Sequence, residues 1–209
     1  MDSILIIIMA IRTTQKIIDF LIRQDACFQL LYDKFGLIEY EEESTIFESI
    51  VFTIVGQMLS NKAASTIYGR IVTVLKEVTP ETVIGSDIET LRACGTSYAK
   101  IKYIKNFAKM YANHQIDFKN LSQRSDKEVV DYLTKVDGIG VWTAEMIALF
   151  TLGRENIFSI HDVALKYGIM RAHLEFKTLS KYRFEQLRKR YSPYCSYASL
   201  YFYKLRDSK

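Results

Sequence analysis

Helix-breaking residues are scarce in this chain, and their scarcity limits the folds open to it more than any other feature. Only two prolines, Pro80 and Pro193, and nine glycines occur among 209 residues. β-Sandwiches and barrels need many turns, which glycine and proline usually supply, so these folds are disfavoured. Because 49% of the residues are hydrophobic, the chain can bury a full core. We therefore expect an all-α fold of one domain or two small lobes.

From Thr13 onward, amphipathic segments with apolar residues near a 3.6-residue period follow one another, which predicts a series of helices. The clearest helices are expected at residues 46–58, 61–76 and 97–111. The Glu-rich segment 39–48 is interpreted as a break between helices. The apolar run from Ile4 to Ile11 is too short to span a bilayer and lacks a basic start, so we expect a short strand or helix rather than an anchor or signal peptide.

Three serines stand just before helical stretches, where a hydroxyl can cap the first free amides: Ser60, Ser97 and Ser125. Ser125 also forms a predicted capping box with Glu128. Ser60 and Ser97 are followed in the first turn by Lys62 and Lys100. There the exposed amides and a positive charge could hold a phosphate together, although plain helix capping explains the serines equally well.

Charge and cysteine content restrict the partners and cofactors of the chain. The net charge is +4, and basic residues gather in segments 92–109 and 166–190, which suits either a phosphate-facing surface or solvated helix faces. The three cysteines lie far apart, without the CxxC spacing of many zinc sites and too few for a four-thiolate iron–sulfur cluster: Cys27, Cys94 and Cys195. We expect reduced, buried thiols in a cytoplasmic protein.

The most specific pattern lies between residues 129 and 165. In order, it comprises a helix ending near Leu133, the sequence VDGIG at 136–140, an apolar helix at 141–152, Gly153 as a C-cap and an extended stretch ending at Asp162. Gly138 and Gly140 permit backbone conformations that other residues resist, so a tight hairpin can point its amides outward at the positive end of the next helix. The sequence therefore predicts an anion site there, although a GxG alone would suit any helix–helix turn.

This arrangement resembles the helix-hairpin-helix DNA glycosylases whose hairpin is followed by an Asp, and most closely the DNA-3-methyladenine glycosylase II branch. Three further segments are similar to motifs of that branch: GQMLSNKAA at 56–64, GTSYAKIKYI at 95–104 and YSPYCSYASLYFYKL at 191–205. The similarity covers roughly residues 46–205 in the same order.

The resemblance implies a single glycosylase unit over residues 1–209, made of two helical lobes with a DNA-binding cleft between them. One lobe is expected at about residues 60–155. The other is expected to combine about residues 10–59 with 156–209.

Asp162 is the residue on which the implied chemistry depends. Cleaving an N-glycosidic bond builds positive charge on the sugar, so a carboxylate near the anomeric carbon is the minimum requirement. By resemblance, Asp162 stabilises this cationic sugar and orients the attacking water. Because Asp162 also stands just ahead of a helix, it could act as an N-cap, and both roles can coexist.

Members of the superfamily that also nick the backbone carry a lysine in the helix after the hairpin, where its amine forms a Schiff base. This chain has Trp142 at that position, so we expect hydrolysis without lyase activity. Alkylated bases such as 3-methyladenine and 7-methylguanine are cationic, which favours stacking on electron-rich rings. Trp142, Tyr194 and Tyr203 are therefore the candidate base-pocket residues, with a core position as the alternative for each ring.

An enzyme that flips a base must fill the gap it leaves, and the family match favours Met58 over Leu59 as the apolar wedge. Either side chain could instead be an ordinary core residue at a helix end. The residues expected to contact DNA are Gln57, Met58, Leu59, Ser60, Lys62, Ser97, Lys100, Gly138, Gly140 and Thr143.

The resulting hypothesis is a glycosylase that excises alkylated bases from double-stranded DNA, acting as a monomer away from membranes. It would be cytoplasmic and nucleoid-associated, or nuclear in a eukaryote. No catalytic metal or redox cofactor is expected, although a monovalent or divalent cation could bridge the hairpin to a phosphate. The alternatives are a bifunctional or oxidised-base glycosylase of the same superfamily and a hairpin module that binds DNA without catalysis.

Overall fold

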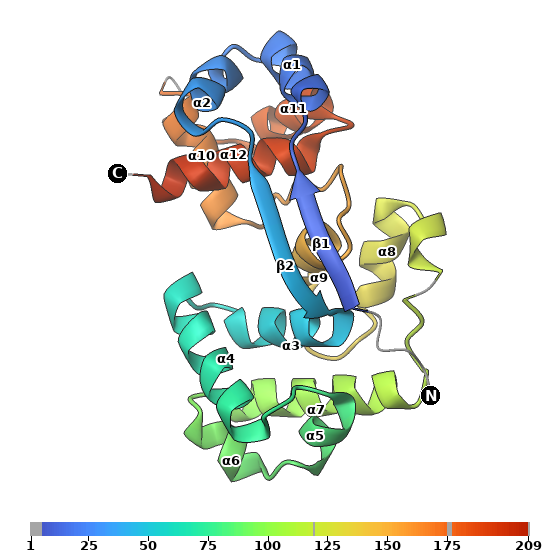
Figure 1. Ribbon diagram of the computed structural model, residues 1–209. Helices are drawn as coiled ribbons and strands as arrows, with labels where there is room; N and C mark the ends of the chain where they lie inside the picture. Colours follow the sequence, from blue (N-terminus) through green and yellow to red (C-terminus); the bar gives the residue numbers. More distant parts are fainter. Residues whose placement is uncertain (1–5, 119, 175–176, 209) are drawn as a thin grey trace. The chain divides into compact units, whose positions relative to one another are not determined.

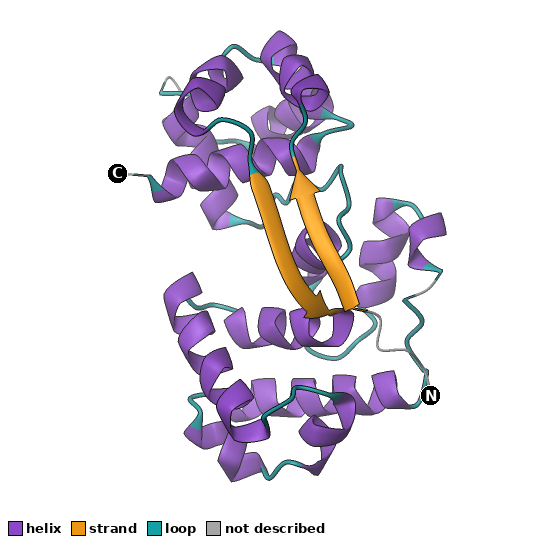
Figure 2. Ribbon diagram, viewed as in Figure 1, coloured by secondary structure: helices purple, strands orange, loops and turns teal. Residues whose placement is uncertain are grey.

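The computed structural model describes residues 6–118, 120–174 and 177–208, and most of them are helical (Figures 1 and 2). This confirms the all-α fold class expected from the scarcity of proline and glycine. The chain separates into two compact units. Unit 1 comprises Glu43–Ile147 and the chain up to Ile7, and unit 2 comprises Ile8–Glu42 and Ala148–Lys209.

Unit 1 is built on a central apolar helix, α3. Its described helices are α3 (Ile46–Gly56), α4 (Asn61–Leu75), α5 (Pro80–Gly85), α6 (Ile88–Ala93), α7 (Tyr98–Ala112), η1 (Leu121–Gln123), α8 (Asp126–Leu133) and α9 (Val141–Met146). Helix α3 packs on α4, α7 and α9, and Phe47 of α3 stacks on Phe107 of α7 with ring centroids 5.3 Å apart. These contacts explain why α3 belongs to unit 1, whereas the sequence placed residues 46–59 in the other lobe.

Unit 2 combines an early segment of the chain, Ile8–Glu42, with its C-terminal part. Its described helices are α1 (Gln15–Gln24), α2 (Cys27–Phe35), α10 (Val163–Ala172), α11 (Lys181–Tyr191) and α12 (Cys195–Asp207). Helix α10 lies against α12, and they approach so closely that a Cβ added to Gly168 would be 2.2 Å from the carbonyl oxygen of Phe202. Phe28 of α2 completes the core, with its ring edge-to-face against Tyr191 at 5.2 Å.

Two strands, β1 (Ile6–Arg12) and β2 (Glu39–Thr45), form a two-stranded sheet, and their arrows run in opposite directions (Figure 2). Strand β1 agrees with the strand alternative for the apolar run, of which Ile4 and Leu5 lie outside the described residues. Segment 39–48 was interpreted as a break between helices, and residues 39–45 do separate α2 from α3, but they form a strand that was not expected. Five glutamates give this segment little strand propensity, but pairing with a neighbouring strand outweighs such a weak local preference.

The helix starts predicted from three serine caps agree with the structure. The hydroxyls of Ser60, Ser97 and Ser125 cap α4, α7 and α8, and Ser125 forms the expected capping box with Glu128. The helix predicted at 141–152 is instead α9 followed by η2 (Ile147–Thr151), a π-helical turn. Among the described residues, no helix is both long and apolar enough to cross a membrane.

Candidate functional site

The hairpin between α8 and α9 depends on one of its two glycines. Gly138 has a φ of +86°, and an added Cβ would lie 2.2 Å from Cγ of Tyr103, so only glycine fits this position. Gly140 has a φ of −79°, and no atom lies within 4 Å of the place where its Cβ would be. The expectation of a special backbone conformation is therefore confirmed for Gly138 and wrong for Gly140. Tyr103, a residue of α7, packs against this turn. It was not predicted from the sequence, because it lies about thirty-five residues before the hairpin and no local pattern links the two.

Helix α9 begins at the hairpin without a side-chain cap, because its N-cap residue is Gly140. By contrast, side-chain oxygens of Ser or Asp cap α4, α7, α8 and α10. Gly140 is exposed, so the positive end of the α9 dipole is accessible. This geometry suits the approach of an anion.

Gln57 ties the hairpin to the end of α3. Its Nε2 donates hydrogen bonds to the carbonyl oxygen of Gly138 at 2.8 Å and to Oγ1 of Thr143 at 3.1 Å. Thr143 is only 4% exposed. The hydroxyl of Thr143 therefore supports the hairpin from inside the protein, and its contact with DNA stays a prediction. Gln57 has the same supporting role.

Lys100, which the sequence predicts to contact a phosphate, binds backbone carbonyl groups within unit 1. Its Nζ donates to the carbonyl oxygens of Val55 at 2.8 Å and Gln57 at 2.6 Å, both at the end of α3. Partial burial lowers the pKa of Lys100 below its ordinary value. Because the ammonium group is engaged in holding the turn after α3, Lys100 acts as a positioning residue within the protein.

That turn presents Met58 to solvent. Met58 has a φ of +58° and is 98% exposed, whereas the following Leu59 is 40% exposed. A left-handed conformation costs a residue other than glycine about 1–2 kcal/mol, and an exposed apolar side chain gains nothing from the core. The structure excludes the core alternative for Met58.

An open groove of about 750 Å³ brings most of these residues together. Six predicted site residues line it: Gln57, Met58, Gly138, Gly140, Trp142 and Thr143. Six further residues that line the groove were not among the predicted site residues: Tyr103, Thr134, Lys135, Val136, Asp137 and Ile139. A smaller hollow of about 350 Å³ at the start of α4 includes Ser60 and Lys62. Ser97 and Lys100 line neither of these two hollows.

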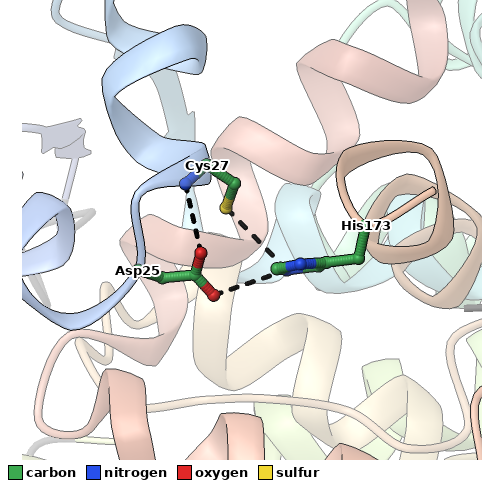
Figure 3. A group of neighbouring side chains, drawn as sticks. All are labelled: Asp25, Cys27 and His173. Carbon is green, nitrogen blue, oxygen red and sulfur yellow. Dashed lines mark hydrogen bonds and ion pairs between the residues drawn. The ribbon is translucent and has the colours of Figure 1, made fainter. Parts of the chain in front are cut away.

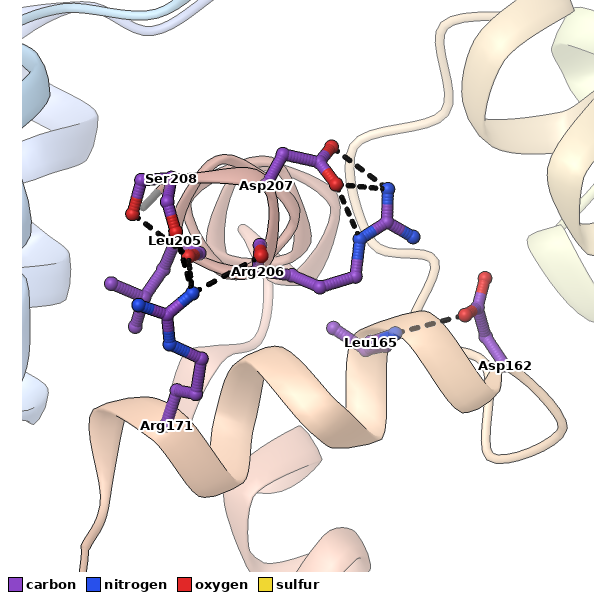
Figure 4. A network of polar contacts seen from close by, with 7 residues as sticks. All are labelled: Asp162, Leu165, Arg171, Leu205, Arg206, Asp207 and Ser208. Atoms are coloured by element: carbon purple, nitrogen blue, oxygen red, sulfur yellow. Dashed lines mark hydrogen bonds and ion pairs between the residues drawn. The ribbon is translucent and has the colours of Figure 1, made fainter. Parts of the chain in front are cut away.

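In unit 2, Asp162 is buried, at 4% exposed, and stands at the N-terminus of α10 (Figure 4). Its Oδ1 accepts a hydrogen bond from the backbone amide of Leu165 at 2.9 Å. Its Oδ2 accepts one from the hydroxyl of Tyr203 at 2.9 Å. The capping role is confirmed, and two donors from two helices fix the orientation of the carboxylate.

Tyr203 reaches Asp162 because α12 is clamped to α10. From the last turn of α10, Nη1 of Arg171 donates to carbonyl oxygens at the end of α12, at 2.7 Å to Leu205 and 2.8 Å to Ser208 (Figure 4). The sequence predicted Tyr203 as a stacking ring, but its hydroxyl contact with Asp162 could only be found in the structure.

Tyr194, the other candidate ring of unit 2, packs inside its own unit. Its ring contacts Phe20 of α1 edge-to-face at 5.2 Å and Tyr197 of α12 at 5.9 Å. These contacts favour the core alternative for Tyr194. Trp142 is half-buried in the hairpin groove of unit 1.

Curated proteins are similar to this chain in sequence over much of its length. An alkylbase DNA glycosidase-like protein of Schizosaccharomyces pombe is 32% identical over 172 residues, which are 78% of this chain and 79% of that protein. DNA-3-methyladenine glycosylase 1 of the same yeast is 32% identical over 136 residues, which are 63% of this chain and 60% of the relative. The chain thus matches less than two thirds of that second relative.

Solved structures show the same fold along nearly the whole chain. A DNA-3-methyladenine glycosidase of Bacillus halodurans has a TM-score of 0.80 and 31% identity, covering 96% of this chain and 93% of that one. A 3-methyladenine DNA glycosylase of Schizosaccharomyces pombe, in complex with abasic DNA, has a TM-score of 0.79 and 26% identity, covering 91% of this chain and 96% of that one.

The family assignment rests on a match that spans most of the chain. A model of the HhH-GPD superfamily of base excision DNA repair proteins matches residues 51–193, which include the second half of α3, the hairpin, α9 and Asp162. The chain belongs to the HhH-GPD superfamily of base excision DNA repair proteins.

Proposed function

We propose that this protein is a monofunctional DNA glycosylase that hydrolyses the N-glycosidic bond of alkylated bases, such as 3-methyladenine and 7-methylguanine, in duplex DNA. The observation that carries the proposal is the buried carboxylate of Asp162, fixed by Leu165 and Tyr203 within a fold shared with named 3-methyladenine glycosylases. The proposed enzyme acts as a monomer on the DNA of a nucleoid or nucleus.

In the proposed mechanism, Asp162 provides the negative charge that the sugar needs as the base departs. Its two hydrogen bonds hold the carboxylate in place before the reaction, so little reorganisation is needed when positive charge develops. Water is the nucleophile, and the carboxylate orients it and takes up its proton. This chemistry needs no catalytic metal or redox cofactor, and a cation bridging the hairpin to a phosphate remains compatible with it.

Unit 1 supplies the proposed contacts with DNA. The accessible N-terminus of α9 and the open space at Gly140 suit a phosphate, and Met58 suits insertion into the base stack in place of a flipped nucleotide. Trp142, in the same groove, suits stacking on a cationic base.

The purified protein is expected to release 3-methyladenine from alkylated duplex DNA and to leave abasic sites rather than strand breaks, because Trp142 cannot form a Schiff base. Chromatography of the released bases and denaturing gels of the DNA measure both products. Covalent trapping with borohydride would contradict the proposal, as would the absence of release from every alkylated substrate tested.

Met58→Ala is expected to weaken binding to lesion-containing DNA about tenfold without lowering stability, since the side chain is 98% exposed and unstacking costs a few kcal/mol that a wedge helps to offset. Fluorescence anisotropy on lesion and undamaged duplexes measures the change. Met58→Leu keeps an apolar side chain and should retain most of the affinity. Equal binding by the Ala variant and the wild type would assign Met58 no role in flipping.

Lys62→Ala and Lys100→Ala are expected to differ, although the sequence assigns both lysines to phosphate contact. Lys62 is exposed, so Lys62→Ala should weaken binding to all duplexes alike. It should also make the slope of log K against log salt concentration shallower by about one. Loss of Lys100 leaves two carbonyls at the end of α3 without their ammonium donor and should lower the free energy of unfolding by about 1–3 kcal/mol. Urea denaturation beside salt-dependent binding separates the two roles, and full stability of Lys100→Ala would refute its structural role.

A further inference from the structure

Unit 2 contains a cluster of metal-ligating side chains, one of them buried and two half-buried, that the proposed glycosylase chemistry does not use. Asp25 and Cys27 flank the turn between α1 and α2, and His173 is the C-cap of α10 (Figure 3). One ligand atom from each residue lies within 4.8 Å of the others. Cys27 and His173 are 146 positions apart in the sequence. The fold therefore brings together three different donor types from distant segments.

The distances around His173 resemble those within a metal coordination sphere. Its Nε2 lies 3.5 Å from Oδ2 of Asp25 and 3.8 Å from Sγ of Cys27. Ligand atoms bound at about 2.0–2.3 Å to a tetrahedral zinc ion lie roughly 3.3–3.8 Å apart. A direct hydrogen bond between a ring nitrogen and a carboxylate would be shorter, at about 2.7–3.2 Å.

The charge and burial of the three side chains also fit a divalent cation. The side chains of Asp25 and His173 are each 9% exposed. A carboxylate, a thiolate and a neutral imidazole together carry two negative charges, which a divalent ion would neutralise inside the protein. Nitrogen, sulfur and oxygen in one set are ligands that zinc accepts readily.

Neighbouring groups already orient the carboxylate. The hydroxyl of Tyr191 donates to Oδ2 of Asp25 at 2.7 Å and also lies 3.5 Å from Nε2 of His173, and the amide of Cys27 donates to Oδ1 at 3.1 Å. Such outer contacts commonly position metal ligands. Nη1 of Arg190 lies 3.5 Å from Oδ2 of Asp25, but its side chain is 49% exposed and can turn toward solvent.

We propose that Asp25, Cys27 and His173 bind one Zn²⁺, with a water molecule in the fourth position, and that this ion ties the α1–α2 turn to the end of α10. The ion stabilises unit 2, because it links the α1–α2 turn to the end of α10 opposite the end that Asp162 caps. It does not depend on the proposed glycosylase activity, since a protein with this fold and no such activity would bind the ion equally well.

Cobalt binding tests the proposal directly. Full-length protein freed of metal with a chelator is titrated with Co²⁺, then with Zn²⁺. We expect one Co²⁺ per chain, with a thiolate-to-cobalt charge-transfer band and the visible bands of tetrahedral cobalt, and displacement by Zn²⁺. Zinc at about 100 times its dissociation constant should raise the Tm by roughly 5–10 °C. Failure of the wild-type protein to bind either ion at micromolar concentration would overturn the proposal.

Two cysteine variants locate the site. Cys27→Ser should abolish the charge-transfer band and weaken zinc binding about 100-fold or more, since loss of a ligand should cost at least as much as loss of an outer-shell partner. Cys94→Ser, in unit 1, is the matched control, because a serine hydroxyl can keep the bond that Cys94 donates to the carbonyl of Thr90. Wild-type binding by Cys27→Ser, or equal loss in both variants, would refute the assignment.

A measurement on the wild-type protein keeps the test decisive if Cys27→Ser does not fold. Zn²⁺ should slow alkylation of Cys27 by iodoacetamide, as followed by mass spectrometry of its peptide, and leave the rates of Cys94 and Cys195 unchanged. Unaltered alkylation of Cys27 at saturating zinc would contradict its role as a ligand.

Discussion

Asp162→Asn is expected to lower single-turnover release of an alkylated base by about 100-fold or more, because the transition state loses a fixed negative charge worth several kcal/mol. The fold should survive. Asn caps a helix almost as well as Asp, and its Oδ1 can still accept from the amide of Leu165. The new amide faces the hydroxyl of Tyr203, which can turn from donor to acceptor.

Three measurements on this variant separate catalysis from structure: excision under single-turnover conditions, affinity for duplex DNA and thermal stability. Tyr203→Phe is the matched control, because it keeps the ring and removes the hydroxyl that donates to Oδ2. It should slow excision by about tenfold, the value of one hydrogen bond of roughly 1.4 kcal/mol. Near-normal excision by a stably folded Asp162→Asn protein would remove the main support for the proposed mechanism.

Gly138→Ala is expected to lower the free energy of unfolding of unit 1 by roughly 2–5 kcal/mol. Part of this loss, about 1–2 kcal/mol, comes from the φ of +86°. The rest comes from the methyl group, which would lie 2.2 Å from Cγ of Tyr103 and force the ring or the turn to move. Urea denaturation measures the loss, and DNA binding should weaken because the hairpin is displaced.

Gly140→Ala provides the comparison, because a methyl group there meets nothing within 4 Å and φ is −79°. Its stability should change by less than about 1 kcal/mol, whereas its DNA affinity should fall about tenfold if a phosphate approaches the hairpin closely. Tyr103→Ala removes the two nearest ring atoms, at 2.2 and 2.4 Å, and should recover part of the cost of Gly138→Ala. Equal stability of the two glycine variants would show that the hairpin tolerates a side chain at residue 138.

Local signals were sufficient for the starts of α4, α7 and α8 and for the capping role of Asp162. The caps at Ser60, Ser97 and Ser125 act through amides two or three residues away, so their sequence positions mark the helix starts directly. The capping role of Asp162 is local in the same sense, since it involves the amide of Leu165. Strand β2 could not be foreseen, because its glutamate-rich sequence is held by pairing with a strand that lies more than twenty-five residues earlier.

The sequence alone determined the helical fold through local contacts, and it located the hairpin and the carboxylate through a motif of fixed spacing. Only the tertiary structure decided which groups these elements meet. In the structure, Lys100 donates to carbonyl oxygens forty-three and forty-five positions away. The hydroxyl of Tyr203 donates to Asp162, and His173 lies beside Asp25 and Cys27. Such long-range contacts follow from how helices pack, and packing depends on the shapes of whole faces rather than on any local pattern.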